Sequence, residues 1–172
     1  MIIKKIGYYE RFQQLKEQVL ELCDSVMTHN HISLQYDPEV GDTSWLNAYG
    51  EDKARRERYF TALQPILKNT EIEKMFDTIG IELRRTRIFA LEPNTVGYTP
   101  HRDITGRIHI PIVTDFDARF YSYEPEEQMC DYMPADGSIY FVDTTKQHTF
   151  KNLSNIRRVH LVGCYYGVKK WN

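Results

Sequence analysis

Residues that could bind a metal ion gather in the second half of the chain. Four of the six histidines lie there, at positions 101, 109, 148 and 160. Residues two apart in an extended segment point the same way, so the imidazole of His101 and the carboxylate of Asp103 can reach one ion. His148, which opens a later strand-like segment, can supply a third ligand. Two histidines and one carboxylate form the donor set of non-heme Fe(II) oxygenases, which leaves three coordination positions for a co-substrate and dioxygen.

Arg158 could hold an organic acid beside that metal. It follows His148 by ten residues and begins a strand whose alternation places Arg158 and His160 on one face and Val159 and Leu161 on the other. A guanidinium inside a small barrel is costly unless it is paired, and its forked donors fit a carboxylate. A dicarboxylic 2-oxo acid would chelate iron at one end and present its other carboxylate to Arg158.

Arg107 and His109 repeat this arrangement on an earlier strand. They share a strand face, opposite the aliphatic Ile108 and Ile110, and lie a few residues beyond Asp103. They could therefore add donors to the same acid. Taken singly, such residues are more often a solvated arginine and a core histidine, but the order and strand phase of the whole set favour a metal site.

The first half of the chain has helical periodicity. Apolar side chains at steps of three and four predict a helix over residues 10–29, and a similar pattern predicts a second helix over 51–68, ended or kinked by Pro65. The segment between them contains turn signals and has room for one short strand. We therefore expect residues 1–80 to form a mainly helical support region.

The hydrophobic period changes from about four to two after Gly80. Just before it, Thr70 and Glu73 form a capping-box pattern for a short helix that Gly80 ends. Short β-branched and aromatic segments follow and predict antiparallel strands: IELRRTRIFALE, GRIHIPIVTD, DARFYSY, GSIYFVD, QHTFKN and IRRVHLVGCYYGV. The fold class is thus mainly β with N-terminal helices, in which the helices cover one outer face of a jelly roll over residues 81–172.

Composition limits the function classes. The 172 residues carry 22 Lys and Arg against 24 Asp and Glu, a formal net charge of −2, and 41% of them are hydrophobic. This is typical of one globular domain without electrostatic attraction to nucleic acid or an anionic membrane. Three dispersed cysteines argue against a disulfide framework, and no segment has the roughly 18 apolar residues that a membrane helix needs. We therefore expect a single-domain cytoplasmic protein that is not inserted in a membrane.

Three segments within residues 85–166 carry motifs that occur together in one enzyme family: LEPNTVGYTPHRDITGRIHIPI, GSIYFVD and QHTFKNLSNIRRVHLV. Together they resemble the aspartyl/asparaginyl β-hydroxylase family of 2-oxoglutarate/Fe(II) dioxygenases, which includes bacterial proline cis-hydroxylases. The resemblance implies a double-stranded β-helix core, a cupin-like jelly roll. Asp103 makes the chain more similar to the proline-hydroxylase branch, because the founding hydroxylase lacks the carboxylate ligand.

The resemblance also implies roles for individual residues. The iron ligands would be His101, Asp103 and His148. Arg158 matches the arginine that binds the distal carboxylate of 2-oxoglutarate, and Arg107 with His109 matches the R-x-H co-substrate motif. The implied cofactors are Fe(II), 2-oxoglutarate and O2, and the implied reaction is hydroxylation of an amino acid, free or within a peptide or protein, with succinate and CO2 as co-products.

Substrate contacts are less well defined by the sequence. Arg102, whose side chain should face away from its two neighbours, and Arg119 are candidates to contact a substrate carboxylate. The acidic and aromatic segment 121–137 is long enough to act as a lid, or it is an ordinary solvated loop. No oligomeric state is predicted.

Other functions fit parts of the same pattern. A zinc-type cupin hydrolase could use the same three ligands, but it needs a general base near the metal and leaves the arginines unexplained. A catalytically silent β-barrel module could bind the metal and 2-oxoglutarate without turnover. Nucleic-acid binding by the arginine-rich runs 54–58 and 84–87 is disfavoured, because such arginines near acidic residues are usually solvated.

Overall fold

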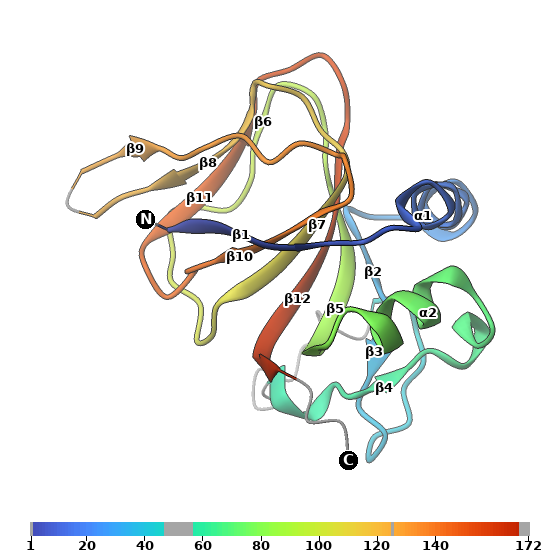
Figure 1. Cartoon of the computed structure of the whole chain (residues 1–172). Coiled ribbons are helices and arrows are strands. Elements are labelled where there is room, and N and C mark those ends of the chain that lie inside the picture. The colour runs from blue at the N-terminus through green and yellow to red at the C-terminus, as the bar shows by residue number, and fades with distance from the viewer. Residues whose placement is uncertain (1, 47–56, 125, 169–172) are drawn as a thin grey trace.

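Antiparallel β-sheets form most of the molecule (Figure 1). The computed structural model describes residues 2–46, 57–124 and 126–168. Within this part, the larger sheet has six strands, in the order β1 (Ile3–Tyr8), β10 (Ser138–Val142), β7 (Arg107–Val113), β12 (Arg158–Val168), β5 (Ile81–Leu91) and β2 (His31–Ser33). The smaller sheet has the order β6 (Thr95–Val96), β11 (His148–Asn152), β8 (Ala118–Ser122) and β9 (Gln128–Met129). A short pair consists of β3 (Gln35–Tyr36) and β4 (Ala62–Leu63).

The chain passes repeatedly from one sheet to the other. From β5 onward the strands belong to the larger, smaller, larger, smaller, smaller, larger, smaller and larger sheet in turn. This alternation produces the double-stranded β-helix, or jelly roll, that the sequence predicts. All six predicted strand segments are confirmed, as β5, β7, β8, β10, β11 and β12.

Two helices cover the outer face of the larger sheet (Figure 1). Helix α1 spans Phe12–Val26 within the predicted 10–29, and α2 spans Glu71–Thr78. Apolar residues of the helices and sheet form one buried cluster, which includes Leu15, Val19, Ile72, Met75, Ile88, Ile108, Ile110, Val159 and Leu161. The predicted outward direction of the last four is therefore confirmed. Among the described residues, no helix is long and apolar enough to cross a membrane.

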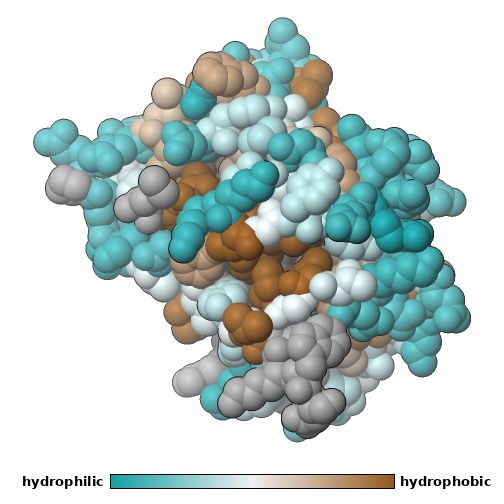
Figure 2. Space-filling model, in the orientation of Figure 1, coloured by the Kyte–Doolittle hydropathy of each residue, from teal (hydrophilic) through white to brown (hydrophobic). Residues whose placement is uncertain are grey.

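A second apolar cluster fills the space between the two sheets. Its members come from both sheets and include Phe89, Leu91, Phe120, Tyr140, Val142, Phe150 and Val162. On the face seen in Figure 2, hydrophilic side chains dominate the periphery and apolar ones are visible nearer the centre. Because β12 pairs with both β5 and β7, its inward residues lie in the middle of this enclosed space.

The first 80 residues contribute more strand than expected. Strands β1 and β2 form the two edges of the larger sheet. Only Ile3 among the residues of β1 is buried. The strand therefore lacks the alternation of apolar and polar residues by which a strand is predicted from sequence. An edge strand with exposed lysines needs little apolar alternation, since its pairing with β10 is made by the backbone. The expectation of a mainly helical support region is therefore wrong for these segments.

The helix predicted over 51–68 is wrong over 57–68, and residues 51–56 lie outside the described part. The structure has 3-10 turns at Glu57–Tyr59 and Pro65–Leu67, with β4 between them. Backbone groups here bond to distant strands: Gln64 N donates to Leu34 O at 2.9 Å, and Arg85 N donates to Phe60 O at 2.9 Å. These tertiary bonds and Pro65 outweigh the local helical preference.

The N-terminus of α2 is held by caps and charges. The predicted cap is confirmed: the Thr70 hydroxyl accepts from Glu73 N at 3.5 Å, and Gly80 follows the helix with φ +66°. Glu71 accepts from Tyr9 Oη at 2.6 Å and from two guanidinium nitrogens of Arg11 at 2.7 Å. These bonds tie the helix to the segment that joins β1 to α1, and they lower the pKa of Glu71 to about 2, chiefly through Arg11.

We expect Glu71→Gln to lower the melting temperature by several degrees at pH 7, because the charge that Arg11 and Tyr9 bond is lost. The folded-state pKa of Glu71 lies below its ordinary value of 4.5, so its contribution is complete above about pH 4.5 and disappears as the pH falls toward 2. The melting temperatures of the wild type and the variant should therefore converge over that range. A constant difference from pH 7 to pH 2 would contradict the charge-based explanation.

Candidate metal centre

The structure brings His101, Asp103 and His148 together between the two sheets. The segment that follows β6 pairs with β11, so that His101 and His148 exchange backbone hydrogen bonds of 3.0 and 2.8 Å. Asp103 N donates to Thr144 O at 2.8 Å, which places its side chain beside the two rings. One possible ligand atom from each of the three side chains lies within 4.8 Å of the others. This is the cluster that the sequence predicted as the metal-binding set.

Hydrogen bonds orient both imidazole rings for metal binding. His101 Nδ1 lies 2.8 Å from Thr99 O, and His148 Nδ1 lies 2.8 Å from Lys146 O. A carbonyl oxygen can only accept, so Nδ1 carries the proton in each ring and Nε2 keeps its lone pair. His148 Nε2 is 3.8 Å from Asp103 Oδ2, too far for a hydrogen bond but close enough for both atoms to bind one ion. The donor set and its outer hydrogen bonds therefore fit Fe(II) or a similar divalent metal.

Packing keeps His148 neutral. Its ring is 1% exposed and stacks on Phe120, with ring centroids 5.0 Å apart and planes inclined by 11°. Burial lowers the pKa of His148 below its ordinary value. The neutral imidazole is the form that binds metals, so this environment favours a ligand role.

Arg107 lies beside the metal-binding cluster, but its donors already have partners. Its guanidinium bonds the Glu57 carboxylate, and Nη2 lies 2.9 Å from Asp103 Oδ1. Nη1 donates to Thr105 Oγ1 at 2.6 Å. The role predicted for Arg107, direct binding of a co-substrate, does not follow from this geometry. Its bonds instead make it a neighbour that orients Asp103.

Arg158 and two histidines form the inner end of the site. Arg158 is 2% exposed and lies on β12 facing the barrel interior, as its predicted strand phase requires. Its Nη2 donates to His160 Nδ1 at 2.9 Å, and His160 Nδ1 is 3.4 Å from His109 Nδ1. Burial lowers the pKa of Arg158 to about 9 and the pKa of both histidines well below 6.5. The two rings are therefore neutral at physiological pH, and Arg158 has no carboxylate partner within the described residues.

Three buried polar atoms at this inner end have no hydrogen-bond partner among the described residues: Arg158 Nη1, His160 Nε2 and His109 Nε2. A buried guanidinium nitrogen without an acceptor is costly, because it loses its hydration and gains nothing. His160 Nδ1 accepts from Arg158, so His160 carries its proton on Nε2 and is a second unused donor. An acceptor that reached Arg158 would satisfy its guanidinium.

A small cavity of about 30 Å³ lies beside the metal-binding cluster and reaches His109 of this inner end. Its walls include all three candidate ligands together with Arg87, Arg107, His109, Phe89, Tyr98, Phe150 and Val162. Arg158 lies just behind this wall, with its guanidinium carbon 5.1 Å from the centroid of the Phe150 ring. A turn of the Phe150 or His109 side chain would open the way from the cluster to Arg158.

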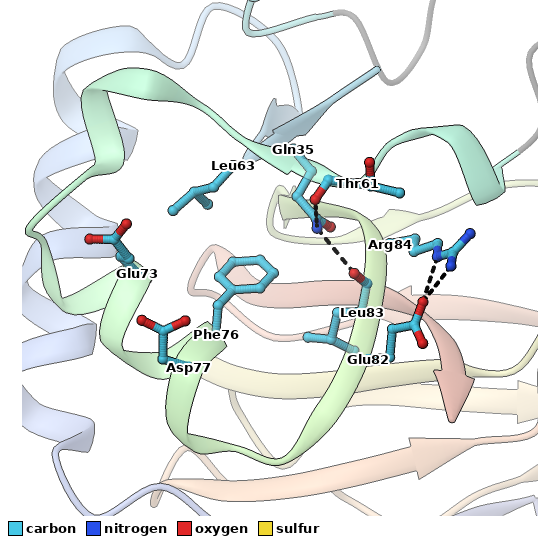
Figure 3. A pocket seen from close by; sticks show the side chains of 9 residues that line it. All are labelled: Gln35, Thr61, Leu63, Glu73, Phe76, Asp77, Glu82, Leu83 and Arg84. Carbon is cyan, nitrogen blue, oxygen red and sulfur yellow. Dashed lines mark hydrogen bonds and ion pairs between the residues drawn. The ribbon is translucent and has the colours of Figure 1, made fainter. Parts of the chain in front are cut away.

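A larger hollow of about 280 Å³ lies elsewhere, between α2, β4 and β5 (Figure 3). Some of the polar groups that Figure 3 shows there bond one another: Gln35 Nε2 donates to Leu83 O at 3.0 Å, and Arg84 pairs with Glu82. Its volume exceeds that of the cavity beside the metal-binding cluster, but its described residues do not include a histidine. Chemistry and not size therefore identifies the cavity beside His101 and His148 as the candidate site.

Two predicted substrate residues do not line the cavity. The Arg102 side chain is 61% exposed and pairs with Glu124. Arg119 points to the outer side of the smaller sheet and lies over the Phe116 ring, 3.8 Å from its centroid. The strand phase that buries Phe120 between the sheets necessarily turns Arg119 outward. Neither arginine lines the cavity beside His101, so their substrate role stays a prediction.

The segment predicted as a lid is partly a strand. Within 121–137, β9 pairs with β8, and Cys130 N donates to Phe120 O at 2.9 Å. Met133 is buried in the cluster between the sheets. These contacts attach much of the segment to the smaller sheet.

Glu57 is a site residue that sequence reasoning missed. It lies in one of the arginine-rich runs considered for nucleic-acid binding, and its neighbour Arg58 is exposed. Its role depends on a contact with a residue 50 positions later, Arg107. No local pattern marks such a contact. The other run, 84–87, lies within β5 and includes Arg87 in the cavity wall and Arg84 in an ion pair.

We expect His148→Ala to weaken Co(II) or anaerobic Fe(II) binding by more than the roughly 10- to 100-fold typical of outer-shell changes, because a direct ligand is removed. The matched control is His29→Ala, since His29 is exposed and its Nδ1 also contacts a backbone carbonyl. Titration calorimetry at constant pH measures the metal affinity of both variants and of the wild type. Equal affinity in wild type and His148→Ala would exclude His148 from the metal site.

Comparison with known proteins supports the fold. No family model and no curated protein matches the chain in sequence. Solved structures match along most of its length: a 2OG-Fe(II) oxygenase family oxidoreductase from Burkholderia pseudomallei is 17% identical, with 89% of this chain and 79% of that chain covered and a TM-score of 0.50.

Two further structures are similar over nearly the whole chain. AviO1 from Streptomyces viridochromogenes Tue57 is 11% identical, with 98% of this chain and 91% of that chain covered and a TM-score of 0.54. A Pseudomonas putida prolyl-4-hydroxylase is 10% identical, with 98% and 94% covered and a TM-score of 0.51. At this identity the likeness establishes the fold: the chain has the jelly roll found in 2OG-Fe(II) oxygenases.

Proposed function

We propose that this protein is a non-heme Fe(II), 2-oxoglutarate-dependent dioxygenase that hydroxylates an amino acid, free or as a residue of a peptide or protein. The observation that carries the proposal is the buried guanidinium of Arg158, which has an unused donor at the inner end of a site that begins at His101, Asp103 and His148. A metal cluster alone fits many functions. A metal cluster with a buried cation behind it fits an anionic co-substrate that spans the two.

The metal would be held by His101 Nε2, His148 Nε2 and one oxygen of Asp103. When bound, Fe(II) supplies the oxidative chemistry in which 2-oxoglutarate and O2 give succinate and CO2 while one oxygen atom enters the substrate as a hydroxyl group. The protein contributes ligand geometry and a space between two apolar sheet faces from which bulk water is excluded. The Asp103 carboxylate also fills the position that a halide would need, which favours hydroxylation over halogenation.

The distal carboxylate of 2-oxoglutarate would bind Arg158. In a buried environment this charge-assisted bond is strong, and a bidentate contact would use Nη1 together with a neighbouring donor. Because His160 and His109 are neutral, Arg158 is the one positive charge of this inner group, which suits a single carboxylate.

The co-substrate needs more room than the cavity of about 30 Å³ provides. We therefore expect the Phe150 or His109 ring to turn when 2-oxoglutarate binds. The aromatic ring of Phe150 would then pack along the methylene groups of the acid, between its two polar ends.

The aspartyl/asparaginyl β-hydroxylase family, and within it the proline cis-hydroxylase branch, remains our proposal for the nearest relatives. It rests on the ordered motifs and on Asp103 as a third ligand. The proposed substrate class is accordingly Pro or an Asp- or Asn-like amino acid. Because Arg102 and Arg119 do not line the cavity, the substrate contacts are expected from its wall, where Arg87 and Tyr98 lie.

Under anaerobic conditions with Fe(II), we expect 2-oxoglutarate to produce a visible metal-to-ligand charge-transfer band, and succinate to form when O2 is admitted. Arg158→Ala should raise the 2-oxoglutarate concentration needed for the band by at least about 100-fold, because a buried charge-assisted bond is lost. Metal affinity should be unchanged. The matched control is Arg157→Ala, which removes the arginine just before β12 that pairs with Glu92.

The outcomes separate the alternatives. If the wild type forms no band, the proposed function is wrong, and a zinc-type hydrolase becomes the next candidate. If the band forms but candidate amino acids or peptides do not stimulate succinate formation, a metal and 2-oxoglutarate sensor is favoured. Equal 2-oxoglutarate binding by Arg158→Ala and wild type would exclude Arg158 from the co-substrate site.

A further inference from the structure

We propose that Glu57, acting through Arg107, fixes the Asp103 carboxylate so that it offers a single oxygen to the metal. This inference rests on the proposed function, because it assumes that a metal binds at His101, Asp103 and His148. Glu57 and Arg107 are positioning residues in this account. Neither would bind the metal or the co-substrate.

The contacts assign different partners to the two oxygens of Asp103. Oδ1 lies 2.9 Å from Arg107 Nη2, an ion-pair distance. Oδ2 lies on the side of the histidines, 3.8 Å from His148 Nε2. A carboxylate held in this way by one oxygen can present only the other to a metal, so the ion pair selects a one-oxygen ligand and leaves further coordination positions open.

Arg107 is in turn held by Glu57. The guanidinium nitrogens Nη1 and Nη2 each bond one oxygen of the Glu57 carboxylate, in a forked arrangement. The two side chains are 5% and 7% exposed, so solvent screens this pair weakly. Without Glu57, the buried charge of Arg107 would have Asp103 as its nearest carboxylate among the described residues.

Hydroxyl groups complete the connection to the backbone beside the ligands. Thr105 Oγ1 donates to Glu57 Oε2 at 2.9 Å and accepts from Arg107 Nη1 at 2.6 Å. Thr144 Oγ1 donates to Thr105 O at 2.8 Å, and Thr144 O accepts from Asp103 N at 2.8 Å. The side chain and the backbone of Asp103 are thus fixed by the same small network.

Charge explains why Glu57 and not only Arg107 is needed. Arg107 shared between two carboxylates attracts each of them less than it would attract one alone. If Glu57 loses its charge, Arg107 binds Asp103 more tightly and competes with the metal for the same carboxylate. Arg85, whose Nη1 lies 3.7 Å from Glu57 Oε1, would lose the charge of this partner as well and add to the positive potential beside the metal.

The test is Glu57→Gln, which keeps the shape of the side chain and removes its charge. We expect the variant to bind Co(II) about 10-fold or more weakly than wild type. We also expect a changed visible ligand-field spectrum at saturating Co(II), because Arg107, released from Glu57, binds Asp103 more tightly and alters how that carboxylate binds the metal. A merely structural role would leave that spectrum unchanged in the folded, saturated protein. Circular dichroism and thermal melting establish the folded fraction.

The matched control is Glu82→Gln, which removes a partly exposed carboxylate that pairs with Arg84 and should leave Co(II) affinity and spectrum as in wild type. If Glu57→Gln does not fold, Thr105→Val removes only the hydroxyl shared by Glu57 and Arg107, and it should weaken Co(II) binding by about 3- to 10-fold. A folded Glu57→Gln, or Thr105→Val in its place, with wild-type affinity and spectrum would overturn the inference.

The same Co(II) titrations distinguish failure of the proposed metal site from failure of the positioning role of Glu57. If wild type and His148→Ala bind Co(II) equally, the metal site itself is wrong, and this inference is overturned with it. If His148→Ala loses Co(II) while Glu57→Gln keeps it, the metal site stands and only the positioning role of Glu57 is wrong.

Discussion

The pairing of β12 with both β5 and β7 is the constraint on which the rest of the structure depends. A central strand of a sheet that is covered on both sides must divide its residues between two different environments. Val159 and Leu161 pack under the helices, so Arg158 and His160 must enter the space between the sheets. The same packing that stabilises the fold therefore places a guanidinium where water does not reach it.

Arg107 and Arg158, both buried between the sheets, differ in how their positive charges are paired, and this difference indicates their roles. Arg107 has carboxylates on two sides, Glu57 and Asp103, and its charge is satisfied without a ligand. Arg158 has a neutral histidine as its partner and keeps an unused donor. Buried charges are retained in folded proteins when something pairs with them. For Arg107 that partner belongs to the chain, and for Arg158 we assign it to the co-substrate.

Features that repeat with the period of a strand or helix can be predicted from the sequence. Features that depend on one contact between residues far apart in the chain cannot. The strand phase of Arg158 and His160 follows from alternation, and Asp103 can be paired with His101 from its spacing alone. Glu57 could not be found in this way, since its partner is 50 residues later. Likewise β1 has few buried residues to reveal it, and its pairing with β10 exists only in the assembled sheet.

The near-neutral net charge of −2 becomes informative beside this geometry. A protein that attracts anions through a basic surface binds them with little selectivity and in a salt-dependent way. Here the cation that would bind the acid is hidden behind His109 and Phe150, so an anion reaches it only by entering the cavity and displacing side chains. Folding has already removed water from Arg158, which leaves its donors unsolvated before the acid arrives. A diacid long enough to touch both the metal and Arg158 gains two strong contacts, whereas a monoacid gains one, and this difference would select the co-substrate by length and charge together.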